Sequence, residues 1–152
     1  MIQSLKEKGG YDSDDFRKRY IAFMTTPASH NDTYIEECHR NFFRNYASGL
    51  PTEQCGVDEK HIGGLVGMIP LVAFYSDRPE QARRAALKQM ALTHPGTKME
   101  TAGSLVIDIL LNVINGQSLQ ETINRQLDTQ RNPLMGHPFR KWLHEPDDRM
   151  IG

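Results

Sequence analysis

The amino-acid sequence predicts an all-α fold, and three observations support that prediction. Apolar residues recur at helical spacing along the chain, and no segment shows the strict alternation of a half-buried strand. Several of these periodic segments follow a residue that can cap a helix. Residues 105–114 are apolar on nearly every side, which is typical of a helix buried among other helices. The 152 residues fit a single domain, 1–152, with an irregular tail over 131–152.

The first part of the chain predicts two amphipathic helices joined by a polar loop. Asp12 is expected to cap the first helix, because its side chain can accept hydrogen bonds from the first free N–H groups. The apolar face of this helix consists of Phe16, Tyr20 and Phe23. Thr33-x-x-Glu36 is a candidate capping box for the second helix. The apolar stripe expected on it consists of Tyr34, Cys38, Phe42 and Tyr46.

The longest uncharged apolar run, residues 62–75, predicts one helix that would be about 21 Å long. This length is short of the ~30 Å hydrocarbon core of a membrane, so we expect no membrane span. A charged amphipathic helix follows, with Pro79 in its first turn, where proline is tolerated. Its inward-facing residues are expected to be Ala82, Ala85, Ala86 and Met90.

Two further helices are predicted before the tail. Thr97-x-x-Glu100 is expected to cap the apolar helix that contains residues 105–114. Because Asp108 lies within that helix, we expect its carboxylate to pair with an arginine from another segment. Ser118-x-x-Glu121 is a strong capping box and starts the last helix of the bundle.

Composition and charge exclude several classes of protein. The formal net charge is −1, so nothing favours binding to nucleic acid or to an anionic membrane. The first ten residues are charged and lack the apolar core of a signal peptide. Cys38 and Cys55 lack the paired spacing of a disulfide framework. Two unpaired cysteines favour reduced thiols and a cytoplasmic location.

Gly63 and Gly64, at the start of the apolar run, have two interpretations. Without side chains, they allow another part of the chain to pack closely against the backbone. Alternatively, they open a helix whose free N–H groups face an anionic ligand such as a diphosphate. The glycine pair by itself does not decide between these interpretations.

Two other segments contain candidate binding residues. His94 ends a helix, where the negative end of the helix dipole stabilises an imidazolium, and it is also our best single candidate for ligand binding. The loop residues His30, Asn31 and Asp32 either cap the next helix or hydrogen-bond a ribose or phosphate. The cysteines and histidines do not have the spacing of a zinc motif, so the sequence predicts no metal site.

Three motifs stand in order along the chain: Gly-Gly-Tyr-Asp with Arg-Tyr at 9–20, a glycine pair and a proline at 61–70, and Gly-Gln-Ser-Leu at the end of 111–119. Their order resembles that of the ADP-ribosylglycohydrolase family, which includes the J-type crystallins. The stretch 9–20, with Gly-Gly-Tyr-Asp followed by Arg-Tyr, resembles a helix of that family. The stretch 61–70 resembles the family's central Gly-Asn-Gly-Gly-Ala-Met-Arg-Val-Ala-Pro pattern in its glycine pair and proline. It departs from that pattern at Ile62, Val66 and Gly67. The stretch 111–119 resembles a Gly-x-Ser-Leu junction between two helices.

The resemblance implies an orthogonal multi-helix bundle that hydrolyses ADP-ribose glycosidic bonds on modified proteins with the aid of two Mg²⁺ ions. It also implies that His94, Gly63 and Gly64 lie at the ADP-ribose pocket, with residues 30–32 in the substrate loop. The acidic metal motifs of the family have no counterpart in this chain. We therefore expect a bundle truncated at both ends, with no catalytic residue, no metal ligand and no cofactor of its own.

Three functions remain open on these grounds. The chain is a hydrolase-like protein that is inactive alone, a non-enzymatic short form that is crystallin-like or binds ADP-ribose, or a fragment without an independent role. The expected partners are ADP-ribose or an ADP-ribosylated protein, and neither nucleic acid nor a membrane. Apolar helices left without neighbours would also favour oligomers.

Overall fold

The computed structural model describes residues 1–59 and 61–128, and these residues form helices and loops without any strand. The predicted all-α fold class is therefore confirmed, while the tail predicted over 131–152 lies outside the described residues. The helices are α1 (Ile2–Lys8), α2 (Ser13–Thr25), α3 (Glu37–Ala47), the 3₁₀ turn η1 (Thr52–Gln54), α4 (Gly63–Val66), α5 (Ile69–Phe74), α6 (Pro79–Met90), α7 (Thr97–Ile114) and α8 (Leu119–Asp128).

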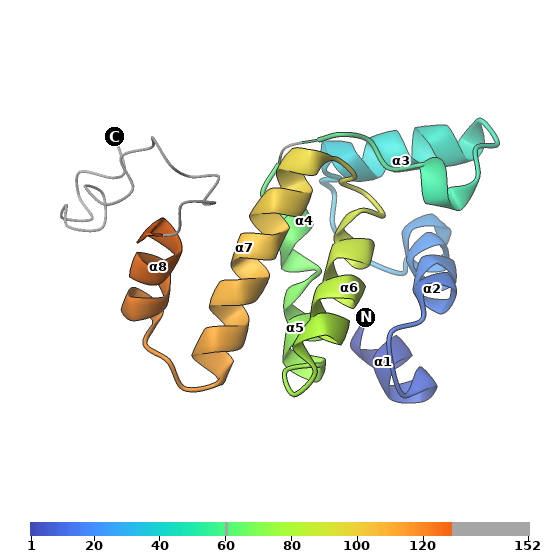
Figure 1. Cartoon of the computed structure of the whole chain (residues 1–152). Coiled ribbons are helices and arrows are strands. Elements are labelled where there is room, and N and C mark those ends of the chain that lie inside the picture. The colour runs from blue at the N-terminus through green and yellow to red at the C-terminus, as the bar shows by residue number, and fades with distance from the viewer. Residues whose placement is uncertain (60, 129–152) are drawn as a thin grey trace.

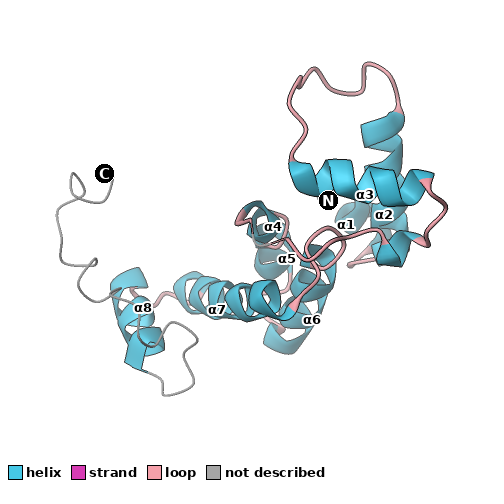
Figure 2. Cartoon of the chain, turned by 90° about the horizontal axis from the view of Figure 1, so that it is seen from above, coloured by secondary structure: helices cyan, strands magenta, loops and turns pink. Residues whose placement is uncertain are grey.

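The helices form three neighbouring groups. Helices α4, α5 and α6 occupy the middle of the molecule (Figure 1). On one side of them lies α7, followed by α8, and on the other side lie α1, α2 and α3 (Figure 2). The middle group therefore contacts both flanks, and any site between α3 and α6 lies where two of the groups meet.

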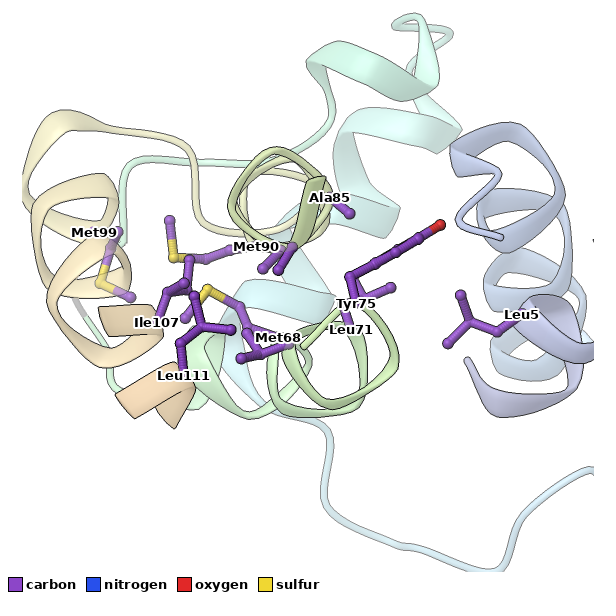
Figure 3. Close-up of a cluster of buried hydrophobic side chains, with 12 residues drawn as sticks. Leu5, Met68, Leu71, Tyr75, Ala85, Met90, Met99, Ile107 and Leu111 are labelled. Atoms are coloured by element: carbon purple, nitrogen blue, oxygen red, sulfur yellow. The ribbon is translucent and has the colours of Figure 1, made fainter. Parts of the chain in front are cut away.

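One hydrophobic core joins the middle group to α7 (Figure 3). Met68 and Leu71 pack against Ile107 of α7, and all three side chains are fully buried. Burying a side chain of this size stabilises the fold by roughly 1.5–3 kcal/mol. The inward residues predicted for α6, namely Ala82, Ala85, Ala86 and Met90, are all buried, which confirms that prediction. Tyr75 extends from this core towards α1, and its hydroxyl accepts a hydrogen bond from the Tyr11 N–H at 2.5 Å.

A second, smaller core joins α2 and α3 to the end of α6. Phe42 and Cys55 are fully buried in it, and the Tyr20 ring meets the Phe42 ring edge-on at 5.1 Å. The stripe predicted on α3 is confirmed at Cys38 and Phe42 and wrong at its two ends. Tyr34 precedes the helix and Tyr46 lies at its far end, and both side chains are exposed. Phe23 of α2, also predicted to face inward, is 51% exposed, because its ring lies against the His30 ring of the following loop, at 5.2 Å, rather than in either core.

Two of the four predicted helix caps are confirmed. The Asp12 carboxylate accepts hydrogen bonds from the N–H groups of Asp14 and Asp15, both at 3.0 Å. The Ser118 hydroxyl accepts one from the Glu121 N–H at 3.4 Å. Both caps therefore satisfy N–H groups that the first turn of a helix leaves free.

The other two predicted caps are wrong. Helix α3 begins at Glu37 rather than after Thr33, and no side chain caps it. Helix α7 begins at Thr97 itself, with Gly96 in the capping position. Gly96 has φ of 131°, a conformation that only glycine adopts readily, and a Cβ there would lie 2.5 Å from a carboxylate oxygen of Asp58. Close packing of this turn against Asp58 therefore coincides with the start of the helix.

The apolar run over residues 62–75 forms two short helices instead of the single helix predicted. Helix α4 ends at Val66, and α5 starts at Ile69 with Pro70 in its first turn. A continuous helix would press the Pro70 ring against the Val66 carbonyl and would lose one hydrogen bond. The break directs α4 towards α7 and the pocket described below.

Helix α7 buries one face rather than all of its surface. Its buried residues, four apart in sequence, are Met99, Gly103, Ile107 and Leu111. The last turn is more open, with Val113 and Ile114 exposed. Asp108 pairs with Arg83 of α6, as predicted for a carboxylate within this helix. Of the described helices, none is sufficiently long and apolar to cross a membrane.

Candidate functional site

A pocket of about 360 Å³ lies where α2, α3, α4 and the end of α6 meet. Its walls include Phe16, Tyr20 and Leu92 of the smaller core together with residues of α4 and α6, so it sits at the junction of the flanking and middle groups of helices. The lining residues are Phe16, Tyr20, Glu36, Cys38, His39, Gly63, Gly64, Val66, Gly67, Gln89, Leu92, Thr93 and His94.

His94 forms part of the inner wall of the pocket. It follows α6 and is only 2% exposed, and its backbone N–H donates to the Met90 carbonyl at 3.0 Å. The ring Nδ1 is 2.9 Å from the Thr93 hydroxyl, whereas Nε2 is buried without a hydrogen-bond partner. Burial lowers the pKa of this imidazole, since the charged form loses its hydration. The His94 ring at the pocket wall is therefore neutral, and its Nε2 lacks a hydrogen-bond partner.

The two glycines of α4 provide space for other side chains. A Cβ at Gly64 would lie 2.7 Å from Cγ of His94, and one at Gly63 would lie 3.0 Å from a carboxylate oxygen of Glu36. The expectation that their N–H groups are free is wrong. The Gly63 N–H donates to Nδ1 of His61 at 3.2 Å, and the Gly64 N–H donates to the His61 carbonyl at 3.3 Å. Of the two interpretations of this glycine pair, close packing agrees with the structure.

The start of α3 contributes a thiol, a carboxylate and an imidazole. Cys38 Sγ lies 3.8 Å from Oε2 of Glu36, and Nδ1 of His39 lies 2.7 Å from the Tyr20 hydroxyl. Burial, assisted by the nearby carboxylates of Glu36 and Glu59, raises the pKa of the Cys38 thiol to about 11. Burial also lowers the pKa of His39. Without a cation, Cys38 is therefore a neutral thiol.

Glu59 reaches the same region from the loop before α4. The loop is held against the turn that carries His94, because the Val57 N–H donates to the Thr93 carbonyl at 3.4 Å. Gly56 lies so close to this turn that a Cβ there would be 2.6 Å from the Leu92 carbonyl oxygen. Oε2 of Glu59 is buried and has no hydrogen-bond partner.

The candidate residues named from the sequence fall into two places. Gly63, Gly64 and His94 line one pocket together. His30, Asn31 and Asp32 do not line it; Asn31 and Asp32 are exposed, and the His30 ring lies 5.2 Å from the Phe23 ring. Glu36, Cys38 and Glu59 were missed as site residues, because no spacing along the chain indicates that these segments meet.

Comparison with known proteins decides the family. The family model for ADP-ribosylglycohydrolase matches residues 1–148. The chain belongs to the ADP-ribosylglycohydrolase family. The resemblance found in the sequence is thus confirmed, and the all-helical structure agrees with it. No curated protein and no solved structure shows a significant match to the chain.

The Mg²⁺ pair implied by the ADP-ribosylglycohydrolase family does not fit the residues that the structure describes. Mg²⁺ prefers oxygen ligands, and each candidate ligand group over residues 1–59 and 61–128 contains a thiol and an imidazole. The acidic residues near the start of α2 are engaged otherwise: Asp12 caps the helix, Asp14 pairs with Arg17 and Asp15 pairs with Arg19. The described residues therefore do not offer a Mg²⁺ pair the oxygen ligands that it needs.

Proposed function

We propose that this ADP-ribosylglycohydrolase-family chain binds the terminal ribose of an ADP-ribosyl group in the pocket beside Gly63 and Gly64, and that it does not hydrolyse the glycosidic bond by itself. The observation that carries the proposal is the convergence of Gly63, Gly64 and His94 on one pocket in a member of this family. A volume of about 360 Å³ lies within the range of small-molecule sites, roughly 300–1,000 Å³.

The polar groups of the pocket favour a sugar over a phosphate. Glu36 offers carboxylate oxygens that accept hydrogen bonds from hydroxyl groups, and Gln89 offers both a donor and an acceptor. None of the lining residues, all from the described part of the chain, is a lysine or arginine. Because the N–H groups of Gly63 and Gly64 also have partners, a diphosphate would find neither a cation nor a free glycine N–H here. The diphosphate is therefore expected outside the pocket.

The proposed lack of hydrolysis follows from the same chemistry. Cleavage of a glycosidic bond needs groups that activate water and stabilise the developing charge. Glu36 is the one carboxylate that lines the pocket, and none of the candidate ligand groups in the described residues suits the Mg²⁺ pair of the family. Without a bound metal ion, binding without turnover is the activity that this arrangement supports.

Calorimetric titration of the full chain with ADP-ribose and with ADP tests the binding. ADP-ribose is expected to bind with Kd below ~1 mM and at least about tenfold more tightly than ADP, which lacks the terminal ribose. Glu36→Gln keeps the shape but loses the charge, and it should weaken ADP-ribose binding about tenfold. Glu37→Gln, at the adjacent exposed position, is the matched control and should bind as the unaltered chain does.

Two outcomes would contradict the proposal. Equal affinity for ADP-ribose and ADP, or no heat with either, would contradict ribose binding in the pocket and favour the crystallin-like structural alternative. Rapid release of ADP-ribose from ADP-ribosylated peptides in the presence of Mg²⁺ would show that the chain is an enzyme after all.

A further inference from the structure

Three side chains of the kind that bind transition metals converge beside the pocket. Cys38 Sγ, a carboxylate oxygen of Glu59 and a ring nitrogen of His94 all lie within 4.8 Å of one another. In a tetrahedral zinc site, bond lengths of ~2.0–2.3 Å place neighbouring ligand atoms about 3.3–3.6 Å apart. Side-chain rotations that bring these three atoms up to about 1.5 Å closer together would complete such a site.

Two of these residues carry buried atoms that lack a partner. Nε2 of His94 and Oε2 of Glu59 are both buried without a hydrogen bond, although buried polar atoms in folded proteins nearly always have one. His94 is 2% exposed, so bulk water does not satisfy its ring. The Thr93 hydroxyl already occupies Nδ1, which leaves Nε2 as the nitrogen that is free to bind a ligand. A cation bound between these atoms would satisfy both of them.

We propose that Cys38, Glu59 and His94 form a Zn²⁺ site. Thiolate and imidazole are ligands that Zn²⁺ prefers and Mg²⁺ does not, so this site differs from the oxygen-ligand sites expected for Mg²⁺. One thiolate and one carboxylate also balance the charge of the ion. Three protein ligands leave the fourth position of the tetrahedron for water or for a molecule in the adjoining pocket. The Zn²⁺ site shares Cys38 and His94 with the pocket proposed for ribose, but its test uses no nucleotide, so failure of one proposal is distinguishable from failure of the other.

The surrounding structure holds these ligands in place. The segment with Glu59 is tied to the turn with His94 through the Val57 N–H and the Thr93 carbonyl. The Thr93 hydroxyl orients the His94 ring in the way that a hydrogen bond to the second nitrogen orients most metal-binding histidines. Cys38 is 2% exposed on the first turn of α3, so the packing around it limits the orientations of its side chain. Such support is what a specific metal site requires.

Titration of the reduced, chelator-treated full chain with Co²⁺, a spectroscopic substitute for Zn²⁺, tests the site without any nucleotide. We expect one Co²⁺ per chain, with a near-ultraviolet charge-transfer band that reports a thiolate ligand and visible bands of tetrahedral geometry. Zn²⁺ should displace the Co²⁺ and abolish both. Absence of the thiolate band at saturating Co²⁺ would overturn the proposal.

The two cysteines of the chain provide a matched control. Cys38→Ser should abolish the charge-transfer band, whereas Cys55→Ser should retain it, since Cys55 is equally buried but lies in the α2–α3 core. His94→Asn and Glu59→Gln should each weaken Co²⁺ binding, and Thr93→Val should weaken it about 10- to 100-fold. Circular dichroism identifies any variant that fails to fold. A band that persists in folded Cys38→Ser, or unchanged affinity in folded Glu59→Gln, would contradict the site.

Discussion

At the scale of single residues, available space determines what the glycines of this chain do. Gly64 sits directly against the His94 ring, with room for a hydrogen atom but not for a methyl group. Gly67, three residues later on the same wall of the pocket, has only the Gln89 side chain near it, and a Cβ at Gly67 would lie 3.9 Å from that side chain. The two glycines look equivalent in the sequence, and only one of them is required by packing.

Gly64→Ala should therefore lower the free energy of unfolding by about 1–3 kcal/mol, the usual cost of forcing an extra methyl group into packed surroundings. Gly67→Ala should be neutral or stabilise the chain by up to about 1 kcal/mol. The Gly67 backbone is already helical, and alanine reduces the backbone freedom of the unfolded chain. Urea denaturation of both variants measures the difference. Equal stability of the two variants would show that the His94 ring moves aside without cost.

At the scale of the helical elements, ion pairs attach α1 to α2. The Asp15 carboxylate accepts hydrogen bonds from the Arg19 guanidinium and the Ser4 hydroxyl, both at 2.7 Å. Lys8 of α1 also lies 3.8 Å from it. The hydrogen bond from Arg19, followed by that from Ser4, holds the pKa of Asp15 at about 2, below its ordinary value of 3.8.

The sign of the resulting pH dependence follows from linkage. Because the pKa of Asp15 is lower in the folded chain, its stabilising contribution is fully present above pH 3.8 and is lost as the pH falls towards 2. Asp15→Asn should reduce the loss of stability over this range, as measured by urea denaturation at a series of pH values. Asp14→Asn, at the preceding exposed position, is the control: this variant should still lose the stability that Asp15 contributes as the pH falls. Identical pH profiles for the unaltered chain and Asp15→Asn would contradict the assignment.

At the scale of the whole molecule, the helices leave apolar side chains on the surface. Ile62, Val66 and Ile69, spaced four and three residues apart around α4 and the start of α5, are 71%, 65% and 48% exposed. Such a group of exposed aliphatic residues on a folded chain is typical of a surface that associates with another molecule. The sequence-based expectation of oligomers stays a prediction.

We expect the sedimentation coefficient of the unaltered chain to rise with protein concentration. Ile69→Lys should reduce this dependence, because a charge at the centre of an apolar interface loses its hydration on association. Ile2→Lys is the control, since Ile2 is as exposed as Ile62 but lies on α1. A constant sedimentation coefficient over the whole concentration range would show that the exposed residues do not mediate self-association.

Local interactions explain which features the sequence predicted correctly. Helical spacing, the caps at Asp12 and Ser118, and the buried face of α6 depend on residues within a turn or two of one another. The predictions that were wrong concern features that depend on contacts between residues far apart in the sequence. The starts of α3 and α7 were assigned to Thr33 and Thr97 by local pattern alone, whereas the packing of Gly96 against Asp58 accompanies the actual start of α7.

Short-range periodicity and the order of motifs are visible in one dimension, and they were enough to predict a helical member of the ADP-ribosylglycohydrolase family. Only packing in three dimensions brings Cys38, Glu59 and His94 together and leaves residues 30–32 outside the pocket. These three residues come from three segments that contact one another only after α3, the loop before α4 and the end of α6 have packed. Burial then leaves Nε2 of His94 and Oε2 of Glu59 without hydrogen-bond partners, whereas water satisfies both atoms in the extended chain.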